Sequence, residues 1–433
     1  MGILSAGSLK PGMVLARDLL TPGGRLVLSK GATLSTKHIE TIKIWGIAGA
    51  DIENATPQDN SERFWETLPS EALEEGQRRV DRRFASCGTG HPFLEELYRI
   101  AVTKAALRLA KGDDPERFFH ISEFPPRRRA AGPLPSPEEL IAGEVALSSF
   151  PDTYFRVVEV IGSPRSSAWH IADVVAKDTS LTAKLLKLVN SSFYNFPSRI
   201  DSLPRAVALI GGNELSTLAL GISAVSMFPE IPEPLVSMRN MWRHAVATGV
   251  LARLFSMPHP EIFQERIFVA GILHDIGRIV LLRHLPEAML EALDQERRKN
   301  IPLCEAETET LGYDHARLGG LLLRHWKIPP VIENSVAWHH NPSQAPSALE
   351  PALLHLADVT SIALGMGIAP AQVAPRLDTD AWRLVGLPPE GLETLVAQSE
   401  RQVAEILEMF GADETHPRPD RETALRRRDR EES

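Results

Sequence analysis

The chain has few cysteines and no excess of positive charge. Cys87 and Cys304 are the only two cysteines, and they lie far apart in the sequence. They cannot form a disulfide framework or a zinc ribbon, so we expect a protein of the reducing cytoplasm. Lys and Arg number 47 against 56 Asp and Glu, a net charge of −9. That charge argues against non-specific nucleic-acid binding, which needs an electropositive surface.

The sequence also lacks a long apolar run. The longest, from residue 215 to 228, is too short to span a bilayer and is interrupted by serines. The first residues, MGILSAGSLKPG, have no basic stretch followed by an apolar core, so no signal peptide is expected. These absences predict a soluble cytoplasmic protein with no membrane role.

The 433 residues are enough for about three structural units. Residues 1–55 alternate short apolar runs with Gly and Pro turns, which predicts a small β-rich module. Ser35 is expected to begin a short helix there, with Ile39 and Ile42 on its apolar face. The other predicted units are a helical segment at 60–120, a Pro/Arg linker at 121–133, a helical domain at 134–364, C-terminal helices at 365–411 and a disordered tail at 412–433.

Apolar residues at three-to-four spacing dominate from residue 134 to about 410. The predicted fold class is therefore mainly all-α, with a small N-terminal β-rich module. The stretch 266–282 is nearly all apolar and predicts one buried helix. The helices between Asp378 and Phe410 could complete the core or form a homodimer contact.

Two other motifs favour structural interpretations. Arg127, Arg128 and Arg129 are three charges in the proline-rich linker and are best interpreted as solvated, not as a phosphate-binding patch. Asp178 is typical of a helix start and Asn190 of a helix end, so the segment between them is predicted to be structural. The aromatic cluster at 193–196 is expected to pack in the core, the alternative being a partner surface.

A set of histidines and aspartates within apolar surroundings carries the strongest chemical signal. A charged aspartate beside His274 in an apolar helix would cost several kcal/mol without compensation. Either Arg278 or a metal ion must compensate it, and imidazole with carboxylate is the ligand set of zinc, iron and manganese. His284, His325 and His355 are interpreted as packed or surface residues. The candidate metal ligands are His244, His274, Asp275, His315, His339, His340 and Asp358.

These motifs resemble a known family. The string His274-Asp275-Ile276-Gly277-Arg278 resembles the central motif of the HD phosphohydrolase superfamily. Residues 134–364 look like an HDOD domain, the HD-related output domain of bacterial signalling proteins, and residues 1–55 resemble the module that precedes many HD-GYP cyclic-di-GMP phosphodiesterase domains. The strings that carry the HDOD resemblance lie at 178–191, 206–212, 242–244, 270–277, 313–316, 338–342 and 356–358.

The resemblance implies an all-helical output domain with a site for two divalent ions, iron, manganese or zinc. It assigns His244, His274 and Asp358 to one ion and the remaining histidines to the other, with Asp275 shared. In an enzyme, Asp275 and Arg278 would be the catalytic residues, Arg278 meeting a phosphate. The GYP string is absent, because residues 341–345 are NPSQA. A third ion is not expected, since Asn240 stands where three-metal members have glutamate.

Two main functions follow. The preferred hypothesis is a regulatory output protein that acts by binding another signalling protein, which the missing GYP string favours. The alternative is a metal-dependent phosphohydrolase acting on a phosphodiester or phosphomonoester such as a nucleotide or cyclic dinucleotide, which the complete ligand set favours. A hybrid would bind a nucleotide without hydrolysing it. Convergence of the ligands in an open cleft would favour hydrolysis or sensing, and a cavity filled by Trp338 or Arg278 would favour the regulatory protein.

Overall fold

The structure is a computed structural model of the chain. It describes residues 2–5, 9–20, 26–44, 49–53, 68–88, 90–112, 134–142, 156, 159–160, 167–227, 237–367 and 372–409. The predicted linker at 121–133, with its arginine triplet, and the predicted tail at 412–433 lie outside the described residues.

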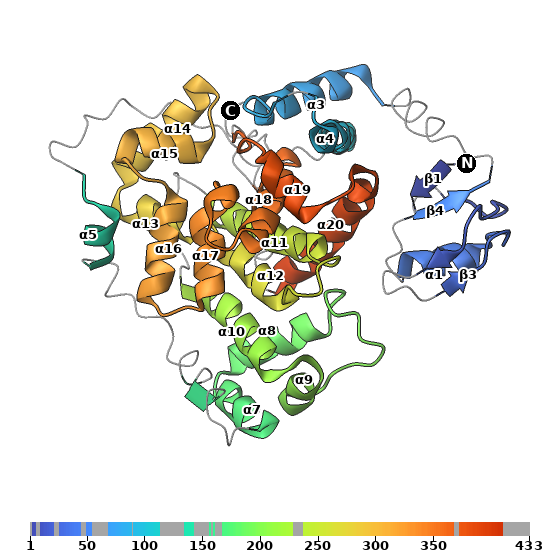
Figure 1. Cartoon of the computed structure of the whole chain (residues 1–433), viewed down its shortest axis with the longest axis horizontal. Helices are drawn as coiled ribbons and strands as arrows, with labels where there is room; N and C mark the ends of the chain where they lie inside the picture. The colour runs from blue at the N-terminus through green and yellow to red at the C-terminus, as the bar shows by residue number, and fades with distance from the viewer. Residues whose placement is uncertain are drawn as a thin grey trace, which may run out of the picture.

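In its described residues, the first unit has two short antiparallel strand pairs and one helix (Figure 1). Strand β1 pairs with β4, and β2 pairs with β3. The hydroxyl of Ser35 accepts a hydrogen bond from the backbone N–H of His38 at 3.2 Å, which begins the helix where the sequence predicts it. Ile39 and Ile42 pack into a separate small core with Leu15. The elements are β1 (Gly2–Ser5), β2 (Leu19–Leu20), β3 (Leu26–Leu28), α1 (Thr36–Ile44) and β4 (Gly49–Ile52).

The described residues from 68 onward are helical, which confirms the predicted fold class. Two 3₁₀ turns, Pro342–Gln344 and Pro389–Gly391, interrupt the series. The helices are α3 (Ser70–Arg83), α4 (Pro92–Ala110), α5 (Pro137–Ala142), α7 (Ala168–Ala176), α8 (Thr179–Val189), α9 (Leu203–Ile210), α10 (Gly212–Met227), α11 (Met238–Phe255), α12 (Gln264–Leu273), α13 (Ile276–His284), α14 (Pro286–Lys299), α15 (Leu303–Leu311), α16 (His315–His325), α17 (Pro330–Trp338), α18 (Leu349–Ala363), α19 (Thr379–Val385) and α20 (Leu392–Met409).

Helix α11 is the centre of this helical body and packs against α12, α18 and α20 (Figure 1). Its side chains Val250, Leu251 and Phe255 are fully buried. The α11–α12 crossing needs glycine on both helices, because a Cβ on Gly271 would lie 2.3 Å from the Cα of Gly249. The two backbones therefore come into direct contact, and α12 brings its C-terminal end to the middle of the molecule.

Helix α20 completes the core, which is one of the two roles predicted for the C-terminal helices; the homodimer contact stays a prediction. Val396 and Ile406 are fully buried in the same apolar cluster as α11. Helices α3 and α4 form an antiparallel hairpin whose Phe93 and Leu97 join that cluster. No single described helix has the length and apolarity to cross a membrane, although the bent pair α9–α10 passes that test when its two helices are taken together.

The prediction of one helix over residues 266–282 is wrong. The chain forms α12 and α13, with a break at His274 and Asp275. The ring Nδ1 of His274 donates to the backbone oxygen of Gly271 at 2.7 Å, and Asp275 leaves helical geometry at φ −93° and ψ 11°. The turn is stabilised by a hydrogen bond from the N–H of Arg278 to the oxygen of Asp275. The break turns both motif side chains toward the same interior space.

The segment around Asp178 is structural, as predicted. The Asp178 carboxylate accepts the backbone N–H of Leu181 at 2.9 Å and starts α8. At the other end, the side-chain amide of Asn190 donates to the oxygen of Ile200 at 2.8 Å. Phe193, only 2% exposed, packs in the core. These residues connect helices and line no part of the candidate site.

Candidate metal centre

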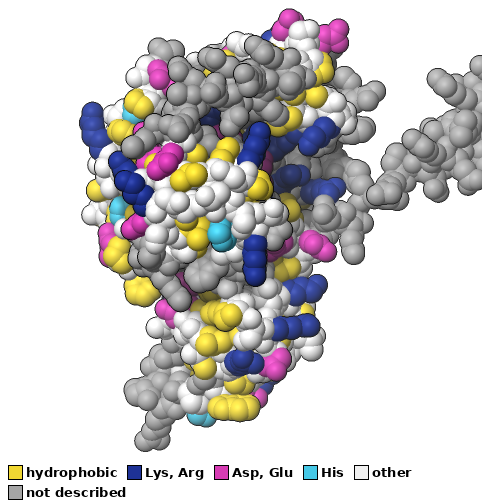
Figure 2. Space-filling model, turned by 90° about the vertical axis from the view of Figure 1, so that its right-hand side faces the viewer, with side chains coloured by type: hydrophobic (Ala, Val, Ile, Leu, Met, Phe, Trp, Pro, Cys, Tyr) yellow, Lys and Arg dark blue, Asp and Glu magenta, His cyan; other side chains and the backbone are white. Residues whose placement is uncertain are grey.

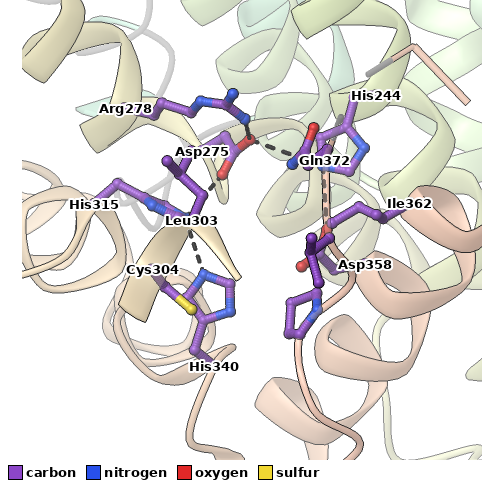
Figure 3. A pocket seen from close by; sticks show the side chains of 12 residues that line it. His244, Asp275, Arg278, Leu303, Cys304, His315, His340, Asp358, Ile362 and Gln372 are labelled. Carbon is purple, nitrogen blue, oxygen red and sulfur yellow. Dashed lines mark hydrogen bonds and ion pairs between the residues drawn. The ribbon is translucent and has the colours of Figure 1, made fainter. Parts of the chain in front are cut away.

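The structure brings all seven candidate ligands together in one interior space, and Figure 3 shows the five of them that line a small cavity there. Five separate parts of the fold supply them: α11, the α12–α13 break, the start of α16, the end of α17 and α18. Six of the seven are buried, and His340 is half-buried. Such a concentration of polar groups inside an apolar core needs either mutual hydrogen bonds or a bound cation. The ligands are His244, His274, Asp275, His315, His339, His340 and Asp358.

The first group of donors lies on α11, α12 and α18. The Nε2 atom of His244 lies 3.1 Å from Oδ1 of Asp358 and 3.2 Å from Nε2 of His274. The Nε2 atom of His274 is in turn 3.7 Å from Oδ1 of Asp358. These spacings fit atoms that surround one small ion, because donors of a tetrahedral or octahedral site about 2 Å from the metal lie roughly 3 Å apart.

The second group lies on α16 and at the end of α17. The Nε2 atoms of His315 and His340 are 3.0 Å apart, and the ring of His339 lies beside both, tilted by 44° and 45° to them. His339 also lies within ligand reach of His274 and Asp358. Its ring therefore stands between the two groups, whereas the family resemblance assigned it to the second ion.

Asp275 connects the two groups. Its Oδ1 lies 3.0 Å from Nε2 of His315 and 3.5 Å from Nε2 of His274, and its Oδ2 lies 3.8 Å from Nε2 of His244. A carboxylate that contacts histidines on both sides is suited to bridge a pair of cations. The position of Asp275 is thus the one that a shared ligand requires.

The orientations of the rings are fixed from outside the cluster. Nδ1 of His274 and Nδ1 of His339 donate to the backbone oxygens of Gly271 and Val336, both at 2.7 Å. Nδ1 of His315 donates to the carboxylate of Glu307 at 2.6 Å. Each of these rings therefore carries a proton on Nδ1 and turns Nε2 inward, toward the other ligands. This is the arrangement of histidines that bind metals.

His339 gives the sharpest indication that a group is to be bound. Its Nε2 is fully buried and has no hydrogen-bond partner among the described residues. Burial and the neighbouring His274 and His315 lower the pKa of His339 to about 3. The ring is thus neutral, with a free lone pair turned toward the other ligands. A cation would satisfy this atom, so the donor set fits a divalent metal.

The electrostatics of the two carboxyl groups also suit a metal centre. Burial alone would raise the pKa of Asp275, but His274, His315 and Arg278 hold it well below its usual range. For Asp358, burial would likewise raise the pKa, but the neighbouring His244 and His274 hold it well below its usual range. Both groups are therefore ionised despite their burial and can act as anionic ligands.

Arg278 lies inside the site and not on an exposed rim. Its side chain is 4% exposed, and Nη1 lies 3.5 Å from Oδ2 of Asp275. Figure 3 shows the guanidinium directed at this carboxylate. Arg278 therefore compensates part of the charge of Asp275, which is one of the two roles that the sequence allowed.

A small cavity adjoins the ligands, and other parts of the chain cover it (Figure 3). Leu303 and Cys304 of α15 form one wall, and Gln372, Val373 and Pro375 form another. Its empty space, with open solvent at the mouth included, is about 260 Å³. Small-molecule sites usually measure roughly 300–1,000 Å³. Arg278 is among the lining residues and Trp338 is not.

Three supporting residues were missed by sequence analysis or were assigned no role at the site. Glu307 is fully buried and also accepts the backbone N–H of His315 at 2.9 Å. The hydroxyl of Ser361 lies 3.0 Å from Nδ1 of His244. His355, interpreted as a packed residue, donates from Nδ1 to the oxygen of His339 at 2.8 Å. For Glu307, the sequence offered only an acidic residue eight positions before His315, and such a spacing is not specific to any site.

Comparison with known proteins shows what the region of this site resembles. The family model of the HDOD domain matches residues 147–342. This part of the chain is thus similar to an HDOD domain. Six of the seven candidate ligands lie within the match, and Asp358 follows it. The α3–α4 hairpin, α18 and α20, which complete the helical body, also lie outside the matched residues.

Relatives of the HDOD domain are distant in sequence. An uncharacterized protein of Treponema pallidum (strain Nichols) is 24% identical over 206 residues, which are 47% of this chain and 40% of that protein's length. The solved chain "Putative phosphohydrolase" from Shewanella amazonensis SB2B has a TM-score of 0.51 at 20% identity, over 63% of this chain and 97% of that one. "Putative signal transduction protein" from Marinobacter aquaeolei VT8 has a TM-score of 0.48 at 18% identity, over 87% and 72%. At these identities the first solved chain shows a shared helical fold and nothing more.

Proposed function

We propose that this chain is a regulatory output protein of bacterial signal transduction. Its HDOD domain holds divalent metal in the cluster around Asp275 and acts by binding a protein partner or a small ligand. One observation carries the proposal: the seven ligands meet in one interior space, and five of them line a single small cavity whose other walls come from α15 and from residues 372–375. The small size of this cavity favours binding and regulation over turnover of a bulky substrate.

The metal site is proposed to hold two ions of iron, manganese or zinc. His244, His274 and Asp358 serve one ion, His315 and His340 serve the other, Asp275 is shared, and His339 lies between. The uncommitted Nε2 of His339 supports a bound cation, since no other described group satisfies it. Bound metal would stabilise the junction of α11, α16 and α18 by joining their side chains.

A regulatory role is supported by what surrounds Arg278. The guanidinium is buried and its Nη1 lies 3.5 Å from Asp275, so a phosphate would have to compete with this carboxylate for Arg278 in this conformation. The empty space is also small for a cyclic dinucleotide. The proposed partner is therefore another signalling protein in the cytoplasm, with a nucleotide as a second class of ligand.

A metal-dependent phosphohydrolase is the second candidate. The position of Asp275 between the two donor groups favours it, because a bridging carboxylate holds two ions close enough to polarise one phosphoryl oxygen. The residues proposed as catalytic in that case are Asp275 and Arg278. This function needs a conformation in which the cavity is open.

Metal analysis of protein purified without chelators tests both candidates. We expect two ions per chain in the wild type, and loss of at least one in Asp275→Ala and in His315→Ala. His325→Ala is the matched control, because His325 is an exposed histidine at the other end of α16 and belongs to no ligand group. Absence of metal from folded wild-type protein, after incubation with each of the three metals, would contradict the proposed site.

The metal-loaded protein then distinguishes the two functions. We expect no release of nitrophenol from bis(p-nitrophenyl) phosphate above the rate of the Asp275→Ala variant. Turnover that depends on metal and is lost in Asp275→Ala would instead establish the phosphohydrolase.

A further inference from the structure

A short strap forms one wall of the metal cavity. We define the strap as residues Gln372–Pro375, of which Gln372, Val373 and Pro375 line the cavity opposite Leu303 and Cys304. The strap has no helical or strand structure. Its position must therefore depend on contacts with other elements.

The main contacts come from the C-terminal end of α3. The backbone N–H of Ala374 donates to the oxygen of Arg83 at 2.8 Å, and the hydroxyl of Ser86 donates to the oxygen of Ala374 at 2.6 Å. On the other side, the N–H of Val373 donates to the buried carboxyl of Glu296 at 3.1 Å. A few hydrogen bonds thus fix the wall of the cavity.

The α3–α4 hairpin also contacts the helix that carries Asp358. Nη1 of Arg108 donates to the oxygen of Leu364, and Nη1 of Arg83 donates to the oxygen of Ala363, both at the C-terminal end of α18. Cations suit a helix C-terminus, where the backbone oxygens lack helical partners. The hairpin therefore contacts both the strap, which forms a wall of the cavity, and α18, which carries the ligand Asp358.

The hairpin is well placed to carry a signal. It lies between the N-terminal β-rich unit and the residues matched to the HDOD domain. Its α4 is joined to α20 by ion pairs between partly exposed groups, among them Lys104 with Glu400 and Arg99 with Glu393. Such pairs contribute little stability each. Because Ala374 is hydrogen-bonded to Arg83 and Ser86, a displacement of the hairpin would carry the strap with it.

We propose that the strap is a cover of the metal pocket and that the α3–α4 hairpin sets its position. In the described conformation the hairpin holds the strap against the pocket and keeps the pocket narrow, and displacement of the hairpin releases the strap and admits a ligand. This autoinhibitory contact deepens the proposed function, since it regulates the same site. It also gives the N-terminal half of the chain a physical connection to the metal ligands.

Cys304 allows the cover to be tested without metal. Its thiol lines the cavity, and Cys87 is the only other thiol in the chain. In a Cys87→Ser reference, which keeps a hydrogen-bond donor near the strap, alkylation by iodoacetamide reports Cys304 alone. The rate is proportional to the population of the open state when closing is faster than alkylation.

Ser86→Ala in this reference should increase the alkylation rate about fivefold, the effect of losing one hydrogen bond to the strap. Glu296→Ala removes the acceptor of the Val373 N–H and should increase the alkylation rate by a similar factor. Tyr98→Phe is the matched control, because it removes a hydrogen bond from Tyr98 to Asp81 within the hairpin and none to the strap. Melting temperatures measured in parallel show whether global unfolding accounts for the rates.

Faster alkylation in both strap variants, with the control unchanged and no matching fall in melting temperature, supports the cover. Equal rates in all four proteins, or rates that follow the melting temperature, would overturn it. These results do not depend on bound metal. Absence of metal from the wild type would thus refute the proposed function, whereas the alkylation rates would still show whether the strap covers the cavity.

Discussion

Replacing Glu307 by glutamine should weaken metal binding at the second donor group about tenfold and leave the fold intact. The carboxylate accepts Nδ1–H of His315 at 2.6 Å and its backbone N–H at 2.9 Å. Glutamine has the same size, and its oxygen can accept one of these bonds. It lacks the negative charge that polarises the ring and makes Nε2 a stronger ligand.

The magnitude follows from the change in hydrogen-bond type. A bond to a charged group contributes about 1.5–3 kcal/mol and a neutral one about 0.5–1.5 kcal/mol, so the loss is roughly 1–2 kcal/mol. Each 1.4 kcal/mol is a factor of about ten in affinity. The result is about 5- to 30-fold, at the lower end of the roughly 10- to 100-fold seen when supporting residues of metal ligands are changed.

Competition with a chromophoric chelator measures this affinity. Glu309→Gln is the matched control, since Glu309 is on the same helix and pairs with Lys299 away from the site. Burial lowers the pKa of His315, but Glu307 and Asp275 together raise it well above the usual value. A proton therefore competes with metal at His315 more in the wild type than in the variant, and the difference in affinity should widen as the pH rises. Equal affinities of wild type and Glu307→Gln at high pH would refute the reasoning.

Three further results are expected. Gly277→Ala should destabilise the protein by at least about 1–3 kcal/mol, because its Cβ would lie 2.1 Å from the backbone oxygen of His315, whereas Gly391→Ala, with no atom within 4 Å, should leave the melting temperature unchanged. Burial raises the pKa of Glu296 from 4.5 to about 8, so the folded state keeps a proton that the unfolded chain loses, and stability falls as the pH rises between these values. Glu296→Gln should remove this decline in urea denaturation measured at pH 5.5 and 8.5. Asp178→Ala should cost about 1 kcal/mol by loss of the α8 cap without changing metal content.

Local signals in the sequence predicted local structure well. Ser35 and Asp178 begin helices because their side chains accept backbone N–H groups three residues later, an interaction that depends only on nearby sequence. The three-to-four spacing of apolar residues predicted the helical body, and it too depends only on nearby sequence. The set of site residues came instead from resemblance, since nothing in their spacing states that five separate parts of the chain converge.

What the sequence did not reveal depends on contacts between distant residues. The apolar run at 266–282 has helical periodicity throughout, and its break at Asp275 is stabilised by a ring-to-backbone bond and by the approach of α16 to Gly277. The strap contact joins residues 288 positions apart in the sequence. The acidic residue that supports His315 resembles any other glutamate of a helix. Each of these features follows from the assembled core and not from a local pattern.

The protonation of the cluster explains how the chain can fold before it binds metal. Despite burial, nearby carboxylates raise the pKa of His274 and of His315. A proton on Nε2 of each ring can be shared with the neighbouring His244 or His340, at 3.2 and 3.0 Å, and balances Asp358 or Asp275. In the metal-free chain these two protons balance part of the negative charge that two cations would balance in the loaded one. His339 gains nothing from the protons, because its Nε2 has no hydrogen-bond partner among the described residues. The cluster therefore tolerates the absence of metal but is satisfied by its presence, and metal uptake must release protons.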